Sequence, residues 1–119
     1  MSAQTYTGGC HCGAVRFEAV GIDTDKAIAC NCSRCGKLGS MLCFVPEANF
    51  TLEKGADQLV EYLFNKRVIH HEFCKVCGVE PFARANAPDG KPMVAVNIRC
   101  LDGVNVHDFK PTPFNGLEI

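Results

Sequence analysis

The chain has 119 residues, of which 47% are hydrophobic and 21% charged, and 12 basic against 13 acidic residues give a formal net charge of −1. This length favours a single domain over residues 1–119, and the composition excludes a disordered chain. The charge excludes the basic surface of a nucleic-acid-binding protein, and no apolar run approaches the roughly 18 residues of a membrane helix. The opening segment MSAQTYTGGC carries no apolar run of a signal peptide, so we expect a cytoplasmic protein without nucleic-acid or membrane partners.

Short segments in which apolar and polar residues alternate predict half-buried β-strands along the chain. The first covers residues 14–20 (AVRFEAV), with Val15 and Phe17 on one face. Residues 33–40 (SRCGKLGS) favour a short helical turn that Ser33 can cap. Residues 59–64 (LVEYLF) alternate less cleanly but also favour a strand. The last segment, MVAVNIRCL at 93–101, would place one apolar face on Val94, Val96, Ile98 and Cys100. With glycine-containing turn signals between the segments, the pattern predicts a mainly β domain of short antiparallel strands.

Nine cysteines are many for a chain of this length, and in a reducing compartment such a density favours metal binding over disulfides. One pair is Cys10 and Cys12, in GGCHCGAVRF, and another is Cys74 and Cys77, in FCKVCGVEPF. A glycine follows each pair, and glycine readily adopts the positive φ that turns backbone N–H groups toward the sulfurs. Four thiolates complete the tetrahedral set of a structural zinc site, so we predict one here. The alternative is four buried free cysteines.

A third group of cysteines, in ACNCSRCGKLG, consists of Cys30, Cys32 and Cys35. Their spacing suits three bonds to one ion, and no fourth donor stands at ligand spacing from them. An open fourth position is typical of a catalytic zinc, which is our prediction. The alternatives are a site closed by another cysteine or a histidine, and iron in place of zinc. Cys43 and Cys100 lie in apolar segments and are predicted to be small buried hydrophobic residues.

The histidines offer little support for either metal site. His11 lies between two predicted ligands and should point away from their metal ion. His70 and His71 are expected to be ordinary surface or strand residues.

A zinc ion held by three thiolates has a net charge of −1 and suits a thiol better than a water molecule. A metal-bound thiol is deprotonated, and the thiolate is both a nucleophile and a leaving group. The three-cysteine motif therefore favours formation or cleavage of a carbon–sulfur bond. Arg34 and Lys37, beside the motif, are candidates for binding an anionic substrate, with ordinary solvated polarity as the alternative. More distant candidates are Arg67, Arg84, Asn97 and Arg99.

The chain contains, in this order, the segments GGCHCGAVRFEA, CNCSRCGKLGS and FCKVCGVEPF. Together they resemble the glutathione-dependent formaldehyde-activating (GFA) enzyme family. Centromere protein V-like proteins share the domain of this family. The segment VNIRCLDGV resembles a late-strand motif of one branch, and the resemblance extends from Gly8 to Phe114. It implies small antiparallel sheets organised around zinc, similar to the methionine sulfoxide reductase B-like fold. It also implies two zinc ions, one on the four paired cysteines and a catalytic one on the three-cysteine motif.

The activity that the resemblance implies is the addition of glutathione to formaldehyde, which yields S-hydroxymethylglutathione and is formally a carbon–sulfur lyase reaction. Asn31 departs from the histidine that the family usually has between the first two catalytic cysteines, a position suited to orienting the substrate. This departure bears on the identity of the substrate more than on metal binding.

Two other functions compete with this lyase of a small thiol adduct. A non-catalytic, zinc-stabilised binding module of the centromere protein V-like kind would need a basic patch, which this chain lacks. A thiol redox enzyme using Cys43 or Cys100 would need an exposed cysteine of low pKa. The sequence leaves the oligomeric state open.

Overall fold

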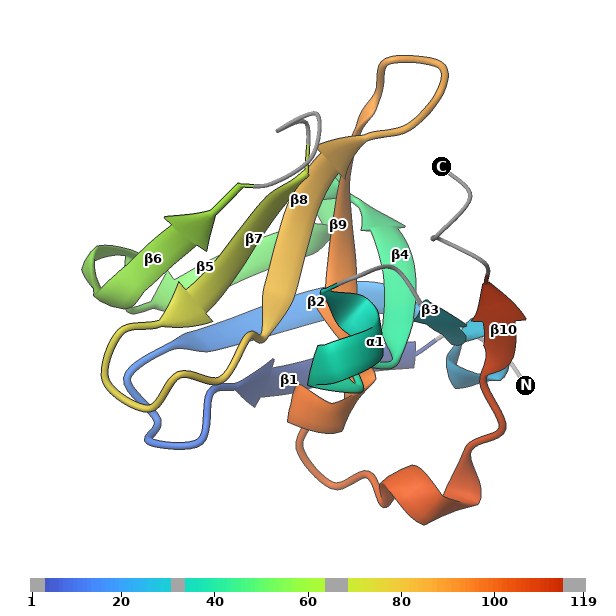
Figure 1. The fold of residues 1–119 in the computed structure, drawn as a ribbon, viewed down its shortest axis with the longest axis horizontal. Coiled ribbons are helices and arrows are strands. Elements are labelled where there is room, and N and C mark those ends of the chain that lie inside the picture. Colours follow the sequence, from blue (N-terminus) through green and yellow to red (C-terminus); the bar gives the residue numbers. More distant parts are fainter. Residues whose placement is uncertain (1–3, 31–33, 64–68, 115–119) are drawn as a thin grey trace.

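The computed structural model describes residues 4–30, 34–63 and 69–114, and these form a mainly β structure (Figure 1). In chain order the strands are β1 (Gln4–Gly9), β2 (Arg16–Ile22), β3 (Ile28–Cys30), β4 (Leu42–Pro46), β5 (Phe50–Lys54), β6 (Leu59–Tyr62), β7 (His70–Cys74), β8 (Phe82–Asn86), β9 (Pro92–Asn97) and β10 (Thr112–Phe114). Within the described residues, the only α-helix is α1 (Cys35–Leu38). The 3-10 turns are Thr24–Lys26, Glu47–Asn49, Ala56–Gln58, Ile98–Cys100 and Val106–Asp108. The predicted mainly β fold of short strands is confirmed.

The strands form two sheets. One has the order β1-β2-β5, and the other has the order β10-β3-β4-β9-β8-β7-β6. All pairs are antiparallel except β10 with β3, where Phe114 lies opposite Cys30 (Figure 1). The sequence pattern did not predict this parallel pair, which places a late strand beside the strand that ends at a cysteine of the three-cysteine motif.

The main core lies between the two sheets. As predicted for residues 14–20, Val15 and Phe17 are fully buried. The Phe17 ring lies 5.2 Å from that of Phe50 and 6.4 Å from that of Phe82, and the last two rings are 4.7 Å apart. Aromatic pairs of this kind add about 0.5–1.5 kcal/mol each beyond the burial of their area. The three rings therefore join β2, β5 and β8 into one core.

The strand predicted over residues 93–101 is shorter than expected. β9 ends at Asn97, whose Oδ1 accepts a hydrogen bond of 3.2 Å from the backbone N–H of Arg99. A side-chain bond of this kind offers the backbone an alternative to the sheet, and the chain continues as the 3-10 turn Ile98–Cys100. Ile98 is nevertheless fully buried, as its place in the apolar pattern predicted.

The prediction that this strand is half-buried is wrong, because both faces of β9 are covered. Val94 and Val96 face the main core, while Ala95 on the other face is only 8% exposed. Ala95 lies opposite Ala83 of β8, and both pack with Cys35 at the start of α1. The small side chains of Ala83 and Ala95 leave room for Cys35 in this second apolar cluster.

The short helix α1 confirms the helical turn predicted over residues 33–40. Its N-cap residue is Arg34, which makes no capping hydrogen bond with its side chain, whereas the expected cap, Ser33, lies outside the described residues. Gly39 ends the helix with a φ of +75°, and its N–H donates to the carbonyl of Cys35 at 2.9 Å. None of the helices in the described part of the chain has the length and apolar character needed to cross a membrane.

Candidate metal centre

The structure brings together the four cysteines that the sequence pairs. The sulfur atoms of Cys10, Cys12, Cys74 and Cys77, the four-cysteine cluster, all lie within 4.8 Å of one another. The Sγ atoms of Cys10 and Cys12 are 3.6 Å apart, and those of Cys12 and Cys74 are 3.7 Å apart. A tetrahedral zinc ion with bonds of about 2.3 Å to sulfur separates its ligands by about 3.8 Å. The cluster can therefore hold a metal ion, and its spacing fits zinc.

Two glycine-containing turns present these sulfurs, one between β1 and β2 and one between β7 and β8. Gly13 has a φ of +82° and Gly78 a φ of +80°, as the knuckle geometry predicted. A Cβ atom at either glycine would meet nothing within 4 Å, so the turns require glycine for its backbone conformation and not for space. The N–H of Val15 points at Cys10 Sγ at 3.3 Å, and that of Val76 at Cys74 Sγ at 3.4 Å. Such N–H groups stabilise thiolates and orient them toward a shared ion.

The cluster lies at the rim of the main core. Cys10 is 7% exposed and Cys74 fully buried, whereas Cys12 is exposed. Cys12 and Cys74 are 62 residues apart in the chain and belong to turns of different sheets. A metal ion bound here would cross-link the two sheets.

The three-cysteine motif is described in part. Cys30 ends β3 and Cys35 begins α1, and both pack in the apolar cluster on the outer face of the large sheet. Cys32 and Asn31 lie outside the described residues, so the catalytic zinc remains a prediction. Among the described residues, the four-cysteine cluster is the only group of three or more histidine, cysteine or acidic side chains placed to hold a metal ion. Lys37 lies exposed on α1, and its substrate-binding role also stays a prediction.

A buried ion-pair network lies between the motif and the sheet, and sequence reasoning missed it. Glu80, 3% exposed, accepts two hydrogen bonds from Arg34 at its Oε1, from Nε at 3.0 Å and from Nη2 at 2.7 Å. Its other oxygen lies 3.0 Å from Nδ1 of His71, which is also 3% exposed. The Arg34 guanidinium lies 4.5 Å from the centre of the Tyr62 ring and 5.9 Å from that of Phe73. The signal in the sequence was a lone glutamate between a cysteine pair and the apolar Pro81-Phe82.

This network changes the interpretation of two predicted residues. His71 lies in strand β7, as expected, but it is buried rather than at the surface. Arg34, a candidate for binding the substrate, directs its guanidinium at Glu80. Contact of Arg34 with a substrate therefore remains a prediction.

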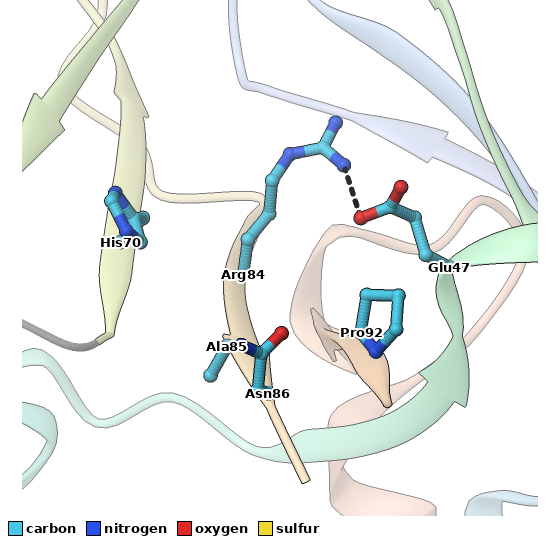
Figure 2. A pocket seen from close by; sticks show the side chains of 6 residues that line it. All are labelled: Glu47, His70, Arg84, Ala85, Asn86 and Pro92. Atoms are coloured by element: carbon cyan, nitrogen blue, oxygen red, sulfur yellow. Dashed lines mark ion pairs between the residues drawn. The ribbon is translucent and has the colours of Figure 1, made fainter. Parts of the chain in front are cut away.

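The more distant polar candidates lie at several separate places. Arg84 donates to Glu72 at 2.8 Å, is paired with Glu47 at 3.8 Å, and lines a shallow pocket with His70 (Figure 2). Its guanidinium stacks on Phe82, so it lies on the face of β8 opposite Ala83 and the helix. Arg99 donates from Nε to the carbonyl of Gly39 at 2.9 Å, Asn97 is buried, and Arg67 lies outside the described residues.

The two remaining cysteines of the core region are not part of the four-cysteine cluster. Cys43 is 4% exposed, and its thiol donates to the carbonyl of Asp23 at 3.3 Å. Burial raises the pKa of Cys43 to about 11 and that of the half-buried Cys100 to about 12. Both groups are neutral thiols at pH 7, which argues against a redox enzyme that uses either of them.

Comparison with known proteins gives two findings. The model of a family described as glutathione-dependent formaldehyde-activating enzyme matches residues 5–114. A crystal structure of a Rhodobacter sphaeroides protein superposes with a TM-score of 0.79 at 30% sequence identity, and the match covers 90% of this chain and 97% of that chain.

Proposed function

Since this chain belongs to the glutathione-dependent formaldehyde-activating enzyme family, we propose that it is a zinc-dependent carbon–sulfur lyase that acts on a small thiol adduct. Glutathione and formaldehyde are the expected substrates, and S-hydroxymethylglutathione is the expected product. The observation that carries this proposal is the family match over residues 5–114, which includes all seven cysteines assigned to metal. The proposal also includes one domain over residues 1–119 and a cytoplasmic location.

Two zinc ions have different tasks in this proposal. The four-cysteine cluster holds a structural ion, which the sulfur separations of 3.6 and 3.7 Å support. The three-cysteine motif holds the catalytic ion on the outer face of the large sheet. Cys30, at the end of β3, lies between neighbouring strands, and Cys35 packs on Ala83 and Ala95. These contacts hold two of the three proposed ligands in place.

Cys30, Cys32 and Cys35 would hold this zinc ion, which would supply a soft fourth position suited to binding and deprotonating a substrate thiol. In the forward reaction the substrate sulfur attacks the carbonyl carbon of formaldehyde, and a carbon–sulfur bond forms. The carbonyl π electrons move to oxygen, which takes up one proton in place of the one that the thiol released. Lys37, exposed on α1, offers a cation to a carboxylate of glutathione.

Calorimetry of glutathione binding in buffers of different ionisation enthalpy tests this proposal. We expect about one proton to be released per glutathione bound near neutral pH, because binding deprotonates the thiol. Cys35→Ser should abolish the proton release and should reduce the zinc content from two ions per chain to one. Cys43→Ser, which places the same change at a cysteine outside both sites, should keep both properties.

Either of two results would contradict the lyase proposal. One is that glutathione binds the wild-type protein without releasing a proton. The other is that it binds equally well to the Cys35→Ser protein. The non-catalytic binding module would then be the better interpretation.

A further inference from the structure

Glu80 links the turn of the four-cysteine cluster to the segment that carries Cys35. It follows Cys77 by three residues, and its carboxylate pairs with Arg34, the residue before Cys35. We propose that Glu80 is a positioning residue that acts through Arg34 to hold Cys35 in the geometry required for metal binding. This inference rests on the proposed function, because it concerns the metal ion of the three-cysteine motif.

Burial makes the pair of Glu80 and Arg34 energetically costly. Burying a carboxylate is unfavourable unless it is paired and hydrogen-bonded, and well-packed apolar residues often stabilise a fold equally well. Glu80 is 3% exposed, and three nitrogen atoms of Arg34 and His71 lie at hydrogen-bond distance from its two oxygens. A pair that contributes little net stability but has well-defined geometry is better suited to orienting a segment than to stabilising the fold.

The backbone of Arg34 lies at the start of α1. Its carbonyl accepts from the N–H of Lys37 at 3.1 Å and from that of Leu38 at 2.9 Å. As its side chain does not cap the helix, the backbone of Arg34 starts α1 while its guanidinium is held by Glu80. Fixing the guanidinium therefore fixes the first turn of the helix, to which Cys35 belongs.

Glu80 itself is held by the large sheet. Its carbonyl accepts from Nδ2 of the buried Asn97 at 3.0 Å. The next carbonyl, of Pro81, accepts from the N–H of Asn97 at 3.0 Å, and that of Val79 accepts from the N–H of Cys74 at 3.0 Å. The carboxylate thus projects from a backbone anchored on β7 and β9, which makes it a fixed reference for the helix.

The burial of these residues separates positioning from substrate binding. At 3% exposure, Glu80 has almost no surface for a substrate, whereas the Arg34 side chain is 21% exposed. A substrate-binding role for Arg34 alone would leave Glu80 without effect on the metal. A positioning role requires changes at either residue to weaken metal binding at the three-cysteine motif.

Cobalt(II) titration of the metal-depleted full chain, read from the thiolate-to-cobalt absorption, tests the proposal with Arg34→Met, Glu80→Leu and the double variant. We expect the second equivalent of cobalt(II) to be the one that binds at the three-cysteine motif. Each single variant should bind this second equivalent about tenfold or more weakly, which is the usual effect of losing a partner that orients a ligand. The first equivalent should bind as in the wild type. The double variant should be no weaker than the worse single variant, because the two residues act as one unit.

Arg16→Met is the matched control, since Arg16 also pairs with a carboxylate, that of Asp102, but outside the three-cysteine motif. It should leave the second equivalent unchanged. If Glu80→Leu does not fold, Arg34→Met, at the more exposed end of the pair, carries the test. Unchanged affinity for the second equivalent in Arg34→Met overturns the proposal, and weaker glutathione binding in that protein would then make Arg34 a substrate ligand. A wild-type protein that binds only one equivalent instead refutes the proposed function, so the two failures are distinguishable.

Discussion

Replacing Cys74 by serine should remove one of the four metal ligands, weaken metal binding by the four-cysteine cluster and destabilise the fold. Structural zinc contributes about 10–16 kcal/mol in small zinc domains, so one of four thiolates accounts for about 3 kcal/mol. With an unfolding entropy of about 2.1 cal/mol/K per residue, the 119 residues give about 0.25 kcal/mol/K. The expected loss therefore lowers Tm by about 12 °C. Scanning calorimetry in the presence of zinc, together with metal analysis of the purified protein, measures both effects.

Cys43→Ser is the matched control for this prediction. Cys43 and Cys74 are 4% and 0% exposed and belong to the same core cluster, but only Cys74 lies in the four-cysteine cluster. The Cys43 thiol donates to a carbonyl that a serine hydroxyl can also reach, so we expect a loss of only about 1 kcal/mol, or about 4 °C. If both variants melt at the same temperature with full metal content, the metal assignment of the cluster is refuted.

The glycine turns, the buried thiols and the two metal sites can each be tested separately. Gly55→Ala should lower the free energy of unfolding, measured by urea titration, by more than about 2 kcal/mol. The reason is that Gly55 has a φ of +95° and that a Cβ there would lie 2.2 Å from the carbonyl oxygen of Ala14. Gly13→Ala, which has open space around the new Cβ, should lower it by only about 1 kcal/mol. Because their pKa values are raised to about 11 and 12, Cys43 and Cys100 should resist alkylation by iodoacetamide at pH 8. As long as the fold persists, their alkylation rate should rise about tenfold per pH unit up to the raised pKa, because only the thiolate reacts. Rapid labelling at pH 8, measured by mass spectrometry, would contradict this. A chelator should remove the ion of the three-cysteine motif before that of the four-cysteine cluster and leave the circular dichroism spectrum intact, whereas loss of structure with the first ion would reverse the two assignments.

Some features were predictable because their signal is local. The buried face of residues 14–20 follows from a period of two along seven residues, and Val15 and Phe17 lie as that period predicts. Pairing of the two cysteine turns was also predictable, since glycine after each pair indicates the knuckle conformation and four thiolates complete one ion. The length of β9 was not predictable, because the hydrogen bond that the Asn97 side chain accepts from the N–H of Arg99 competes with the sheet only in the folded turn.

By itself, the sequence determined the mainly β class, the short helix and the cysteine pairs that can hold a metal ion, because each depends on residues close together in the chain. Only the tertiary structure decided that Arg34 meets Glu80, 46 residues away, and that Ala83 and Ala95 form the surface under α1. It also decided that β10 pairs in parallel with β3. The physical reason is that a side chain's partner across a sheet depends on strand order and register, and these result from burying the whole core at once rather than from any one segment.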